Sequence, residues 1–414
     1  MEPLKGNLIF GQSGGPTAVI NSSAAGVFLE AMKHEGVIGE IYGAAHGIKG
    51  ILEEQFYDMR QEDPQELVYL KTTPSSSLGS VRYKLADYHE DDTDYKRLLE
   101  VFKKYDIRYF FYNGGNDSMD TCNKISSFMQ ENGYECRVMG VPKTIDNDLY
   151  GTDHCPGFAS AAKYIATSTM EVYQDARVYD TGQITIIEVM GRNAGWLTAA
   201  TVLAAHKGSG PDLIYLPEVP FSLEKMTADI KRIYDQTGKV IVAVSEGVQT
   251  EDGKYIPELI GEVKTDAFGH KQMGGTAAVL ADYVMDHFDT KVRAIELSLL
   301  QRSASHLASG YDVEEAYEAG ATAVRAAVEG KTDFMVGFER VSNDPYEIKY
   351  ILIPLEKVAN TEKKVPREWI NEDGNFVNDQ YIEYALPLIK NQSDQPKEDG
   401  LPRFARLKKV LATK

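Results

Sequence analysis

Apolar runs of strand length alternate with helix-like stretches along most of this chain of 414 residues. The strand-like runs lie at 7–10, 38–42, 108–112, 137–141, 183–189, 212–216 and 240–245. Such alternation is typical of parallel sheets that are covered by helices. The sequence therefore predicts an α/β fold, in which ligands bind at the carboxyl ends of the strands.

Three of these runs end in a turn that is rich in glycine or polar residues. The turns read GQSGGPTA at 11–18, NGGNDS at 113–118 and PKTIDND at 142–148. Paired glycines let backbone amides approach an anion, and a helix amino terminus adds positive potential. A single glycine turn is common in every α/β protein, but three of them predict one extended phosphate site. None has the spacing of a Walker A loop or of a dinucleotide fingerprint, which disfavours P-loop enzymes and Rossmann dehydrogenases.

The third turn also carries groups suited to proton transfer. Pro142 cannot continue a central strand, so the residues after it are expected just beyond the strand's end. Asp146 and Asp148 would share a face of an extended backbone, where one carboxylate can act as a base and the other can bind a metal or a hydrogen-bond donor. The competing interpretation is a structural turn that Asp and Asn stabilise by bonding their own backbone.

Four motifs in order make the chain resemble the phosphofructokinase family. They are SGG at 13–15, GGNDS at 114–118, PKTIDND at 142–148 and EVMGR at 188–192, and the resemblance extends roughly to residue 340. It implies two Rossmann-like lobes with parallel sheets flanked by helices. The larger lobe, residues 1–155 with 303–355, would bind the phosphoryl donor, and the smaller, residues 156–302, the sugar phosphate. Residues 356–414 would form a C-terminal extension.

Within the family the chain resembles the pyrophosphate-dependent branch. ATP-dependent members usually have glycine at the positions of Asp117 and Lys143. A carboxylate at 117 would repel the α-phosphate of a nucleotide, and a lysine at 143 adds charge for pyrophosphate, which lacks an adenosine anchor. The implied reaction is reversible, Mg²⁺-dependent phosphoryl transfer from pyrophosphate to the 1-hydroxyl of fructose 6-phosphate, a step of glycolysis.

Two alternatives stay open. One is an ATP-dependent 6-phosphofructokinase, in which the nucleotide fits despite Asp117 and Lys143. The other is a non-catalytic regulatory subunit that only binds sugar phosphate. The intact Asp146, Thr144 and Arg192 argue against the second, because a subunit that only binds has no need of a base aimed at a hydroxyl.

The resemblance also implies roles for single residues. Asp146 would take the proton of the sugar hydroxyl, Thr144 would orient the reacting groups, and Asp148 would support the base or the metal. Lys143 and Arg192 would stabilise the transferring phosphoryl oxygens. The implied phosphoryl-donor contacts are Gly14, Gly15, Arg82, Gly115, Asp117, Ser118 and Lys143. The implied sugar-phosphate contacts are Thr144, Asp146, Met190, Gly191, Arg192, Glu246, Arg293, Arg302 and Tyr311.

Some positions depart from the family pattern. The implied Mg²⁺ ligands are Asp117 and Asn116, although the branch commonly has two aspartates there and an amide is the poorer ligand. Leu299 replaces a histidine of the sugar-phosphate pocket, and Gln183 replaces an arginine that crosses a subunit interface. His306 and Tyr311 are the candidate substitutes. Family members form dimers or tetramers, so a homo-oligomer is expected.

Composition and the two terminal segments limit the partners, the location and the kinds of site that are expected for this chain. A net charge of −18 argues against a nucleic-acid partner. The sequence has no uninterrupted apolar run of membrane-spanning length and no signal-peptide core near Met1, so a cytoplasmic protein with no membrane partner is expected. The three cysteines show no CxxC spacing and predict neither a disulfide nor a zinc site. Apolar residues at helical spacing in 403–414 predict a capping helix or an oligomer contact.

Overall fold

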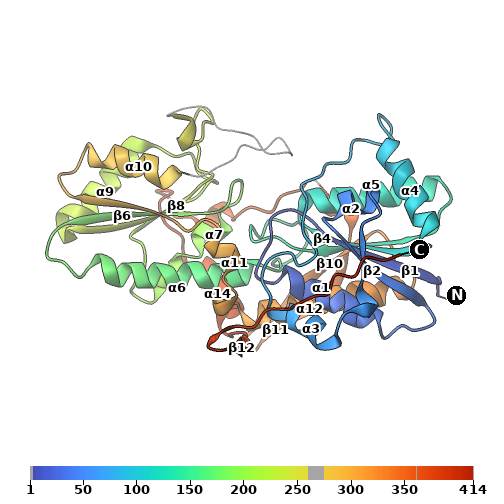
Figure 1. The fold of residues 1–414 in the computed structure, drawn as a ribbon. Coiled ribbons are helices and arrows are strands. Elements are labelled where there is room, and N and C mark those ends of the chain that lie inside the picture. The colour runs from blue at the N-terminus through green and yellow to red at the C-terminus, as the bar shows by residue number, and fades with distance from the viewer. Residues whose placement is uncertain (1–2, 260–274, 360, 414) are drawn as a thin grey trace. The chain divides into compact units, whose positions relative to one another are not determined.

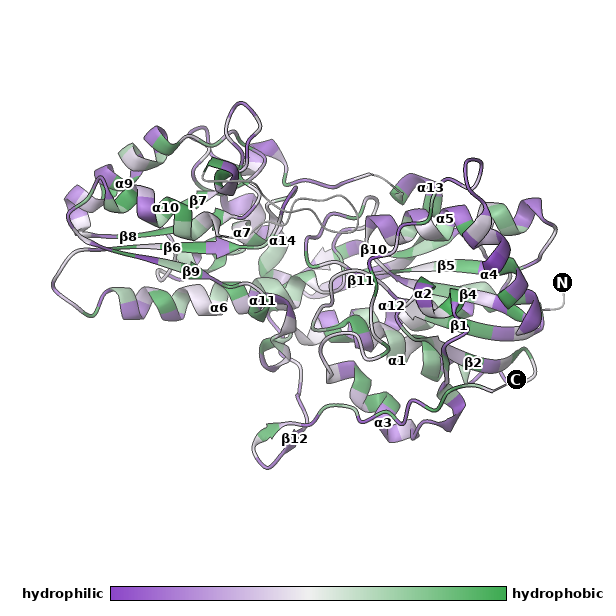
Figure 2. Ribbon diagram, turned by 45° about the horizontal axis from the view of Figure 1, so that its top comes forward, coloured by the Kyte–Doolittle hydropathy of each residue, from purple (hydrophilic) through white to green (hydrophobic). Residues whose placement is uncertain are grey.

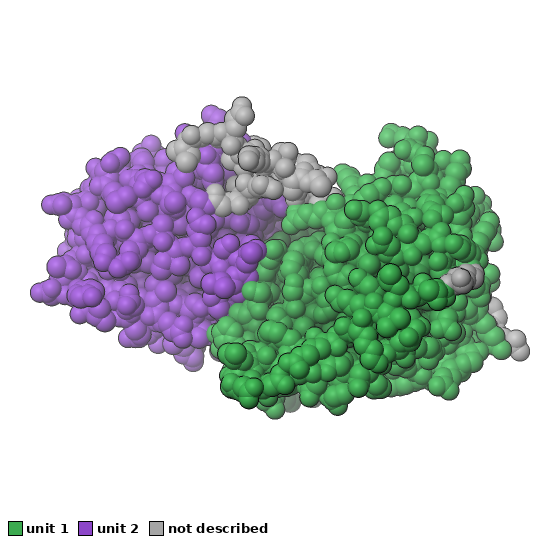
Figure 3. Space-filling model, in the orientation of Figure 1, with its two compact units in different colours: residues 1–157, 302–362, 391–414 green, residues 158–301, 363–390 purple. Residues whose placement is uncertain are grey.

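The computed structural model describes residues 3–259, 275–359 and 361–413. The chain forms two compact units, coloured separately in Figure 3. Unit 1 consists of residues 1–157, 302–362 and 391–414, and unit 2 of residues 158–301 and 363–390. The chain therefore enters unit 2 twice and returns to unit 1 twice.

Unit 1 is built on a seven-stranded sheet with the order β11-β10-β5-β4-β1-β2-β3 (Figure 1). All pairs are parallel except the two at the edges, β2 with β3 and β10 with β11. The strands are β1 (Gly6–Gln12), β2 (Ile38–Ala44), β3 (Phe56–Asp58), β4 (Ile107–Gly114), β5 (Arg137–Pro142), β10 (Phe334–Asn343) and β11 (Tyr346–Pro354). Its helices are α1 (Ile20–Ala31), α2 (Ile48–Leu52), α3 (Pro64–Tyr69), α4 (Thr93–Lys104), α5 (Asn116–Glu131), α12 (Gly310–Val328) and α13 (Leu355–Val358).

The central strands of unit 1 are largely apolar (green in Figure 2), and their side chains enter two separate cores. Successive side chains of a strand point to opposite faces, so Ile9 and Leu8 of β1 enter different cores. The Ile9 core is closed by side chains of α4 and α5, and the Leu8 core by side chains of α1 and α12. Helices therefore cover both faces, which leaves the carboxyl ends of the strands to carry the polar turns.

Two glycines allow α1 and α12 to lie against each other. A Cβ on Gly26 would lie 1.9 Å from the Tyr317 carbonyl oxygen, and a Cβ on Gly320 would lie 2.2 Å from the Ser23 carbonyl oxygen. Any side chain at either position would force the helices apart. This contact fixes α12, whose first turns enter a polar network described below.

Unit 2 contains a four-stranded parallel sheet with the order β7-β8-β6-β9. The strands are β6 (Gln183–Val189), β7 (Leu213–Tyr215), β8 (Lys239–Ser245) and β9 (Lys291–Glu296). Its helices are α6 (Phe158–Ala176), α7 (Trp196–Ala199), α8 (Val202–His206), α9 (Leu223–Thr237), α10 (Thr276–Met285) and α14 (Asp379–Ile389), and α11 (Leu300–Ser303) spans a boundary between the units. Side chains of α9 and α10 pack on the sheet in one apolar core.

The predicted α/β fold with parallel sheets is confirmed, and the seven predicted strand runs coincide with β1, β2 and β4 to β8 to within two residues. The described residues also form five short 3-10 helices: η1 (Met59–Gln61), η2 (Leu70–Thr72), η3 (Ile256–Leu259), η4 (Ser305–Leu307) and η5 (Arg367–Trp369). In the described ranges, no helix has both the length and the apolar character needed to cross a membrane.

The prediction of a helix in the C-terminal tail is wrong. Residues 403–410 form neither helix nor strand, and they follow a small hairpin of β12 (Lys397–Glu398) and β13 (Leu401–Pro402). The backbone N–H groups of Lys408 and Lys409 donate to the Glu62 carboxylate at 2.7 Å each. The amide of Asp58 donates to the Val410 carbonyl at 2.8 Å. These tertiary hydrogen bonds take the donors and acceptors that a helix would pair internally.

Candidate active site

Lys143 joins the three polar turns of unit 1. Its amide donates to the Gly114 carbonyl at 3.0 Å, so the third turn begins beside the second. Its ammonium Nζ donates to the Gly15 carbonyl at 2.7 Å and lies 3.3 Å from the position that a Cβ on Gly14 would take. Gly14 has φ +73°, a conformation that favours glycine. The structure therefore brings the first and third turns together around one buried amine.

Two arginines share this space with Lys143. Arg302 Nη1 lies 2.8 Å, and Arg82 Nη2 4.0 Å, from the position that a Cβ on Gly15 would take. Burial lowers the pKa of Lys143 to about 8, and repulsion from Arg302 and Arg82 contributes to this shift while attraction to Asp146 opposes it. A polyanion bound among the three cations would relieve that repulsion.

The second turn leads directly into α5. A Cβ on Gly114 would lie 1.9 Å from Ser118 Oγ, so glycine is needed where the strand passes the first turn of the helix. Gly115 is the N-cap of α5, and its φ of −92° is one that any residue can adopt. A Cβ on Gly115 would lie 3.5 Å from the Lys143 carbonyl oxygen, which places this residue beside the third turn. Asp117 is exposed in the first helical turn.

The two carboxylates of the third turn lie close together but not on an extended backbone. Asn147, between them, has φ +56°, and its Oδ1 accepts the Cys155 amide at 2.9 Å. Asparagine tolerates this left-handed conformation better than most residues. The Asp146 amide donates to Thr144 Oγ1 at 3.1 Å. The premise of an extended backbone is therefore wrong, and a tight turn brings the carboxylates near each other instead.

The environment of Asp148 disfavours its negative charge. Burial raises the pKa of Asp148 to about 7, and repulsion from Asp146 and Glu362 adds to the effect, while a hydrogen bond with Thr144 opposes it. Asn116 Nδ2 donates to Asp148 Oδ2 at 3.1 Å. A cation beside this carboxylate would favour the ionised form.

Asn116 supplies an oxygen that a metal ion could use. Its Oδ1 is buried and has no hydrogen-bond partner among the described residues. No group of three or more His, Cys, Asp or Glu side chains in that part of the chain could hold a metal by itself. Mg²⁺ commonly binds through one or two protein oxygens together with substrate phosphates and water. The oxygens of Asn116 and Asp148 fit that pattern, with Asp117 nearby in sequence.

Unit 2 gathers a second set of candidate residues at the carboxyl ends of β6 and β8. The Gly191 amide donates to Glu246 Oε1 at 3.3 Å, and Ser245 Oγ donates to the Gly191 carbonyl at 2.5 Å. Gly191 has φ +132°, so the turn needs glycine here. The Met190 amide donates to Gln301 Oε1 at 3.1 Å. Met190, Gly191 and Glu246 thus form one cluster, with Arg192 partly buried next to it.

Arg293 lies apart from that cluster within unit 2. It pairs with Thr185 in the β6–β9 ladder, four residues before Val189, which corresponds to about 13 Å along a strand. Arg293 and Gln183 instead line a hollow of about 580 Å³ between β9, β6 and α6. Leu299, which follows β9, is 57% exposed.

Tyr311 lies at the start of α12 in unit 1. Its ring centroid is 4.6 Å from that of Tyr346 on β11. His306, in η4, is exposed, and its carbonyl accepts Gln392 Nε2 at 3.3 Å. Both belong to the same unit as Arg302.

Sequence reasoning missed several residues that support these groups. Glu362 acts on Asp148 from more than two hundred positions away in the chain, and Gln301 binds the backbone of Met190. Neither belongs to a recognisable motif. His154, six residues after Asp148, could have been noticed, because a histidine next to an aspartate follows the third turn directly.

Comparison with known proteins identifies relatives along nearly the whole chain. The family model described as "Phosphofructokinase" matches residues 7–327. A protein of Xanthomonas campestris pv. campestris named pyrophosphate–fructose 6-phosphate 1-phosphotransferase is 44% identical, covering 99% of this chain and 98% of its own. A protein of Halomonas elongata with the same name is 43% identical over 97% of this chain and 96% of its own. The crystal structure of a pyrophosphate-dependent phosphofructokinase from Marinobacter aquaeolei has a TM-score of 0.89 and 40% identity, covering 99% of this chain and 98% of that one.

Proposed function

This chain belongs to the phosphofructokinase family, and from that premise we propose how its residues perform the reaction. The chain is a pyrophosphate–fructose 6-phosphate 1-phosphotransferase: it transfers a phosphoryl group from pyrophosphate to the 1-hydroxyl of fructose 6-phosphate, giving fructose 1,6-bisphosphate and phosphate. The observation that carries the proposal is the buried ammonium of Lys143 against Gly14 and Gly15, with Arg82 and Arg302 beside it.

Pyrophosphate is the donor that suits this cation group. Lys143, Arg82 and Arg302 offer three positive charges within one small space, and no aromatic or apolar anchor for an adenine is needed to explain them. The glycines at 14 and 15 leave room for phosphate oxygens next to the cations. As the phosphoryl group moves, the same cations stabilise the charge that develops on its oxygens and on the leaving phosphate.

Asp146 acts as the base in this proposal. Its carboxylate accepts the proton of the sugar 1-hydroxyl as the oxygen attacks the phosphorus, and the bond to the leaving phosphate breaks. Thr144 orients the base, because its hydroxyl accepts the Asp146 amide. Asp148 has its negative charge disfavoured by burial and by repulsion from Asp146, and it is assigned to support the base and the Mg²⁺ rather than to take the proton.

Residues at the start of α5 carry oxygen atoms of the kind that bind Mg²⁺. Asn116, through its unpartnered Oδ1, and Asp117 would hold the ion, with Asp148 beside Asn116. When bound, Mg²⁺ neutralises charge on the pyrophosphate oxygens.

The sugar is assigned to the cluster of unit 2. Glu246 accepts hydrogen bonds from sugar hydroxyls, which a carboxylate does well. The Met190 and Gly191 amides are held in place beside the sugar by hydrogen bonds to Gln301 and Glu246. The Arg192 guanidinium stabilises the negative charge on the oxygens of the transferring phosphoryl group. Tyr311, in unit 1, is assigned to the sugar phosphate. Arg302, for which the resemblance implied the same role, lies beside Gly15 and Lys143 and is assigned here to the pyrophosphate.

A homo-oligomer is part of the proposal. Arg293 is exposed at the edge of the unit 2 sheet and lies far along the strands from the Met190–Glu246 cluster of its own chain. It can serve a 6-phosphate if it is donated to the site of a second subunit, where the hollow beside β9 becomes part of the contact.

The test is the initial rate of fructose 6-phosphate phosphorylation with Mg²⁺ and either pyrophosphate or ATP as the sole donor. We expect turnover with pyrophosphate and at least about a hundredfold lower kcat/KM with ATP, which corresponds to a transition-state difference of about 3 kcal/mol. Turnover with ATP alone would overturn the donor assignment, and turnover with neither donor would favour a binding subunit.

A further inference from the structure

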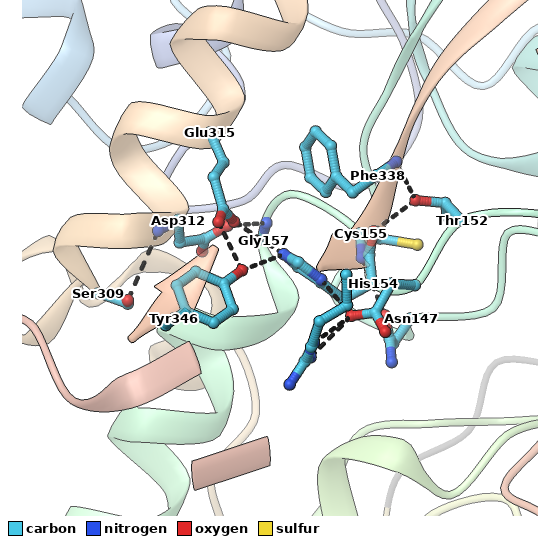
Figure 4. A network of polar contacts seen from close by, with 12 residues as sticks. Asn147, Thr152, His154, Cys155, Gly157, Ser309, Asp312, Glu315, Phe338 and Tyr346 are labelled. Carbon is cyan, nitrogen blue, oxygen red and sulfur yellow. Dashed lines mark hydrogen bonds and ion pairs between the residues drawn. The ribbon is translucent and has the colours of Figure 1, made fainter. Parts of the chain in front are cut away.

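A buried ionic network in unit 1 is centred on His154 (Figure 4). The His154 side chain is fully buried. Its Nδ1 lies 2.7 Å from Asp153 Oδ2, and its Nε2 lies 2.7 Å from Glu315 Oε2 on α12. A carboxylate only accepts hydrogen bonds, so both ring nitrogens carry a proton and the ring is an imidazolium. Burial lowers the pKa of His154, but Glu315 and Asp153 together raise it to about 9.

Two further residues complete the network. Arg340 Nη2 lies 2.7 Å from Asp153 Oδ2, and Tyr346 donates its hydroxyl proton to Glu315 Oε1 at 2.5 Å. The charges of His154 and Arg340 balance those of Asp153 and Glu315. Loss of one member of such a balanced set leaves an uncompensated buried charge, which is destabilising.

The segment that carries His154 is held on both sides by the rest of unit 1. Thr152 Oγ1 accepts the Phe338 amide of β10 at 2.8 Å, and the Gly157 amide donates to Asp312 Oδ1 of α12 at 2.9 Å. The ring of His154 lies between these two anchors, against the Phe338 ring at 5.0 Å between centroids. Residues 152–157 are thereby attached to β10 and α12.

The same segment holds the catalytic turn. The Cys155 amide donates to Asn147 Oδ1 at 2.9 Å, and the Thr144 amide donates to the Pro156 carbonyl at 3.2 Å. Asn147 separates Asp146 from Asp148 and has the left-handed backbone that sets the direction of both side chains. A shift of residues 154–156 would therefore reorient Asp146.

We propose that His154 is a positioning residue for phosphoryl transfer: its imidazolium, clamped between Asp153 and Glu315, fixes residues 152–157 so that Asp146 points at the sugar hydroxyl. The inference rests on the role of Asp146 in the proposed function. A network that served stability alone would change the unfolding temperature without a specific effect on kcat.

The test is a double-mutant cycle of His154→Gln with Asp146→Ala, with kcat and both KM values measured at pH 7. Because a misoriented base slows the chemical step, we expect His154→Gln to lower kcat at least about tenfold. Both KM values should stay within about twofold. In the Asp146→Ala background the same change should cost nothing further, since the base that His154 positions is already absent.

The matched control is His34→Gln. His34 Nε2 lies 3.3 Å from Glu30 Oε1 on α1, a histidine–carboxylate pair of the same unit that makes none of these contacts with the third turn. The kcat of His34→Gln should equal that of the wild type.

Three results would overturn the inference. They are an unchanged kcat in His154→Gln, an equal loss of kcat with and without Asp146, and a rise in KM that accounts for the whole effect. If His154→Gln does not fold, the charge-balanced pair His154→Gln with Glu315→Gln replaces it, and a folded pair with wild-type kcat overturns the inference equally. Normal turnover of Asp146→Ala alone would instead refute the base assignment, so the two failures are distinguishable.

Discussion

Lys143 is the residue on which donor recognition depends, because its ammonium is buried among Gly14, Gly15 and two guanidinium groups. Replacement by methionine keeps most of the side-chain volume and removes the charge. We expect Lys143→Met to weaken pyrophosphate binding at pH 7 at least about tenfold, the loss of one charge-assisted contact. Isothermal titration of the Mg²⁺-loaded protein with pyrophosphate measures this affinity. The control is Lys49→Met, at an exposed lysine.

The pKa of Lys143 also predicts how this affinity depends on pH. Since the pKa is lowered to about 8, the amine of the free protein is charged below that pH and neutral above it. Pyrophosphate affinity of the wild type should therefore fall between pH 7 and pH 9 more steeply than that of Lys143→Met. Comparing the two proteins cancels the titration of pyrophosphate itself, and parallel pH curves would contradict the prediction.

The sequence predicts the roles of some single residues but not of others. The glycines at 14 and 114 and the position of Lys143 directly after β5 could be predicted, because proline and glycine have strong local preferences. The left-handed turn at Asn147 could not, since it depends on a hydrogen bond from Cys155 that lies eight residues ahead. The charge state of Asp148 depends on Glu362, which no local pattern connects to it.

Among the elements, the C-terminal tail of residues 403–412 stabilises the edge of the unit 1 sheet. It lies along β3, with Asp58 donating to Val410 and the Ala412 amide donating to the Phe56 carbonyl at 2.8 Å. The buried Glu62 accepts two amides of the tail. An otherwise open strand edge is thereby covered.

Glu62→Ala should lower the free energy of unfolding by about 1–3 kcal/mol, because two backbone donors lose their acceptor. Urea unfolding followed by circular dichroism measures this difference. The exposed Glu35→Ala, in the same unit, should stay within about 0.5 kcal/mol of the wild type. Equal stability of the two variants would show that the tail does not depend on Glu62.

The network around His154 should make stability depend on pH. The folded-state pKa is raised from 6.5 to about 9, so the stabilisation is fully present below pH 6.5 and is lost as pH rises through 9. The difference in thermal midpoint between the wild type and His154→Gln should therefore shrink from pH 6.5 to pH 9.5. A constant difference over that range would contradict the imidazolium assignment.

Strands with mostly apolar sequences were predictable, and those that alternate charged and apolar residues were not. β1, β4, β5, β6 and β8 are buried on both faces over most of their length, so most of their residues are apolar. β9 and the outer half of the β10–β11 hairpin alternate charged and apolar residues and do not stand out from surface segments. The tail has helical spacing, but tertiary hydrogen bonds override that local pattern.

For the whole molecule, the division into two units depends on contacts that no local pattern reveals. Residues 363–390 belong to unit 2 because, for example, the Trp196 Nε1 donates to the Lys363 carbonyl at 2.9 Å, and Glu218 accepts the amides of Gly195 and Val365. The family resemblance predicted two lobes, but residues so far along the chain carried none of its motifs.

Mixing two kinds of inactive subunit tests whether Arg293 serves the site of a second subunit. If Arg293 serves the site of a second subunit, Asp146→Ala and Arg293→Ala chains, each nearly inactive alone, should regain activity when co-refolded, because the mixed dimer has one site with both residues intact. Size-exclusion chromatography of the mixture should show a dimer or larger species. No recovery in a confirmed mixed oligomer would place Arg293 in its own chain's site or outside any site.

The central claim is that Asp146 removes the proton of the sugar hydroxyl, and the most direct measurement is steady-state turnover of Asp146→Ala with pyrophosphate, Mg²⁺ and fructose 6-phosphate. We expect kcat to fall by about a hundredfold or more, as for loss of a positioned general base, with the KM for fructose 6-phosphate largely retained. Turnover near that of the wild type would contradict the account.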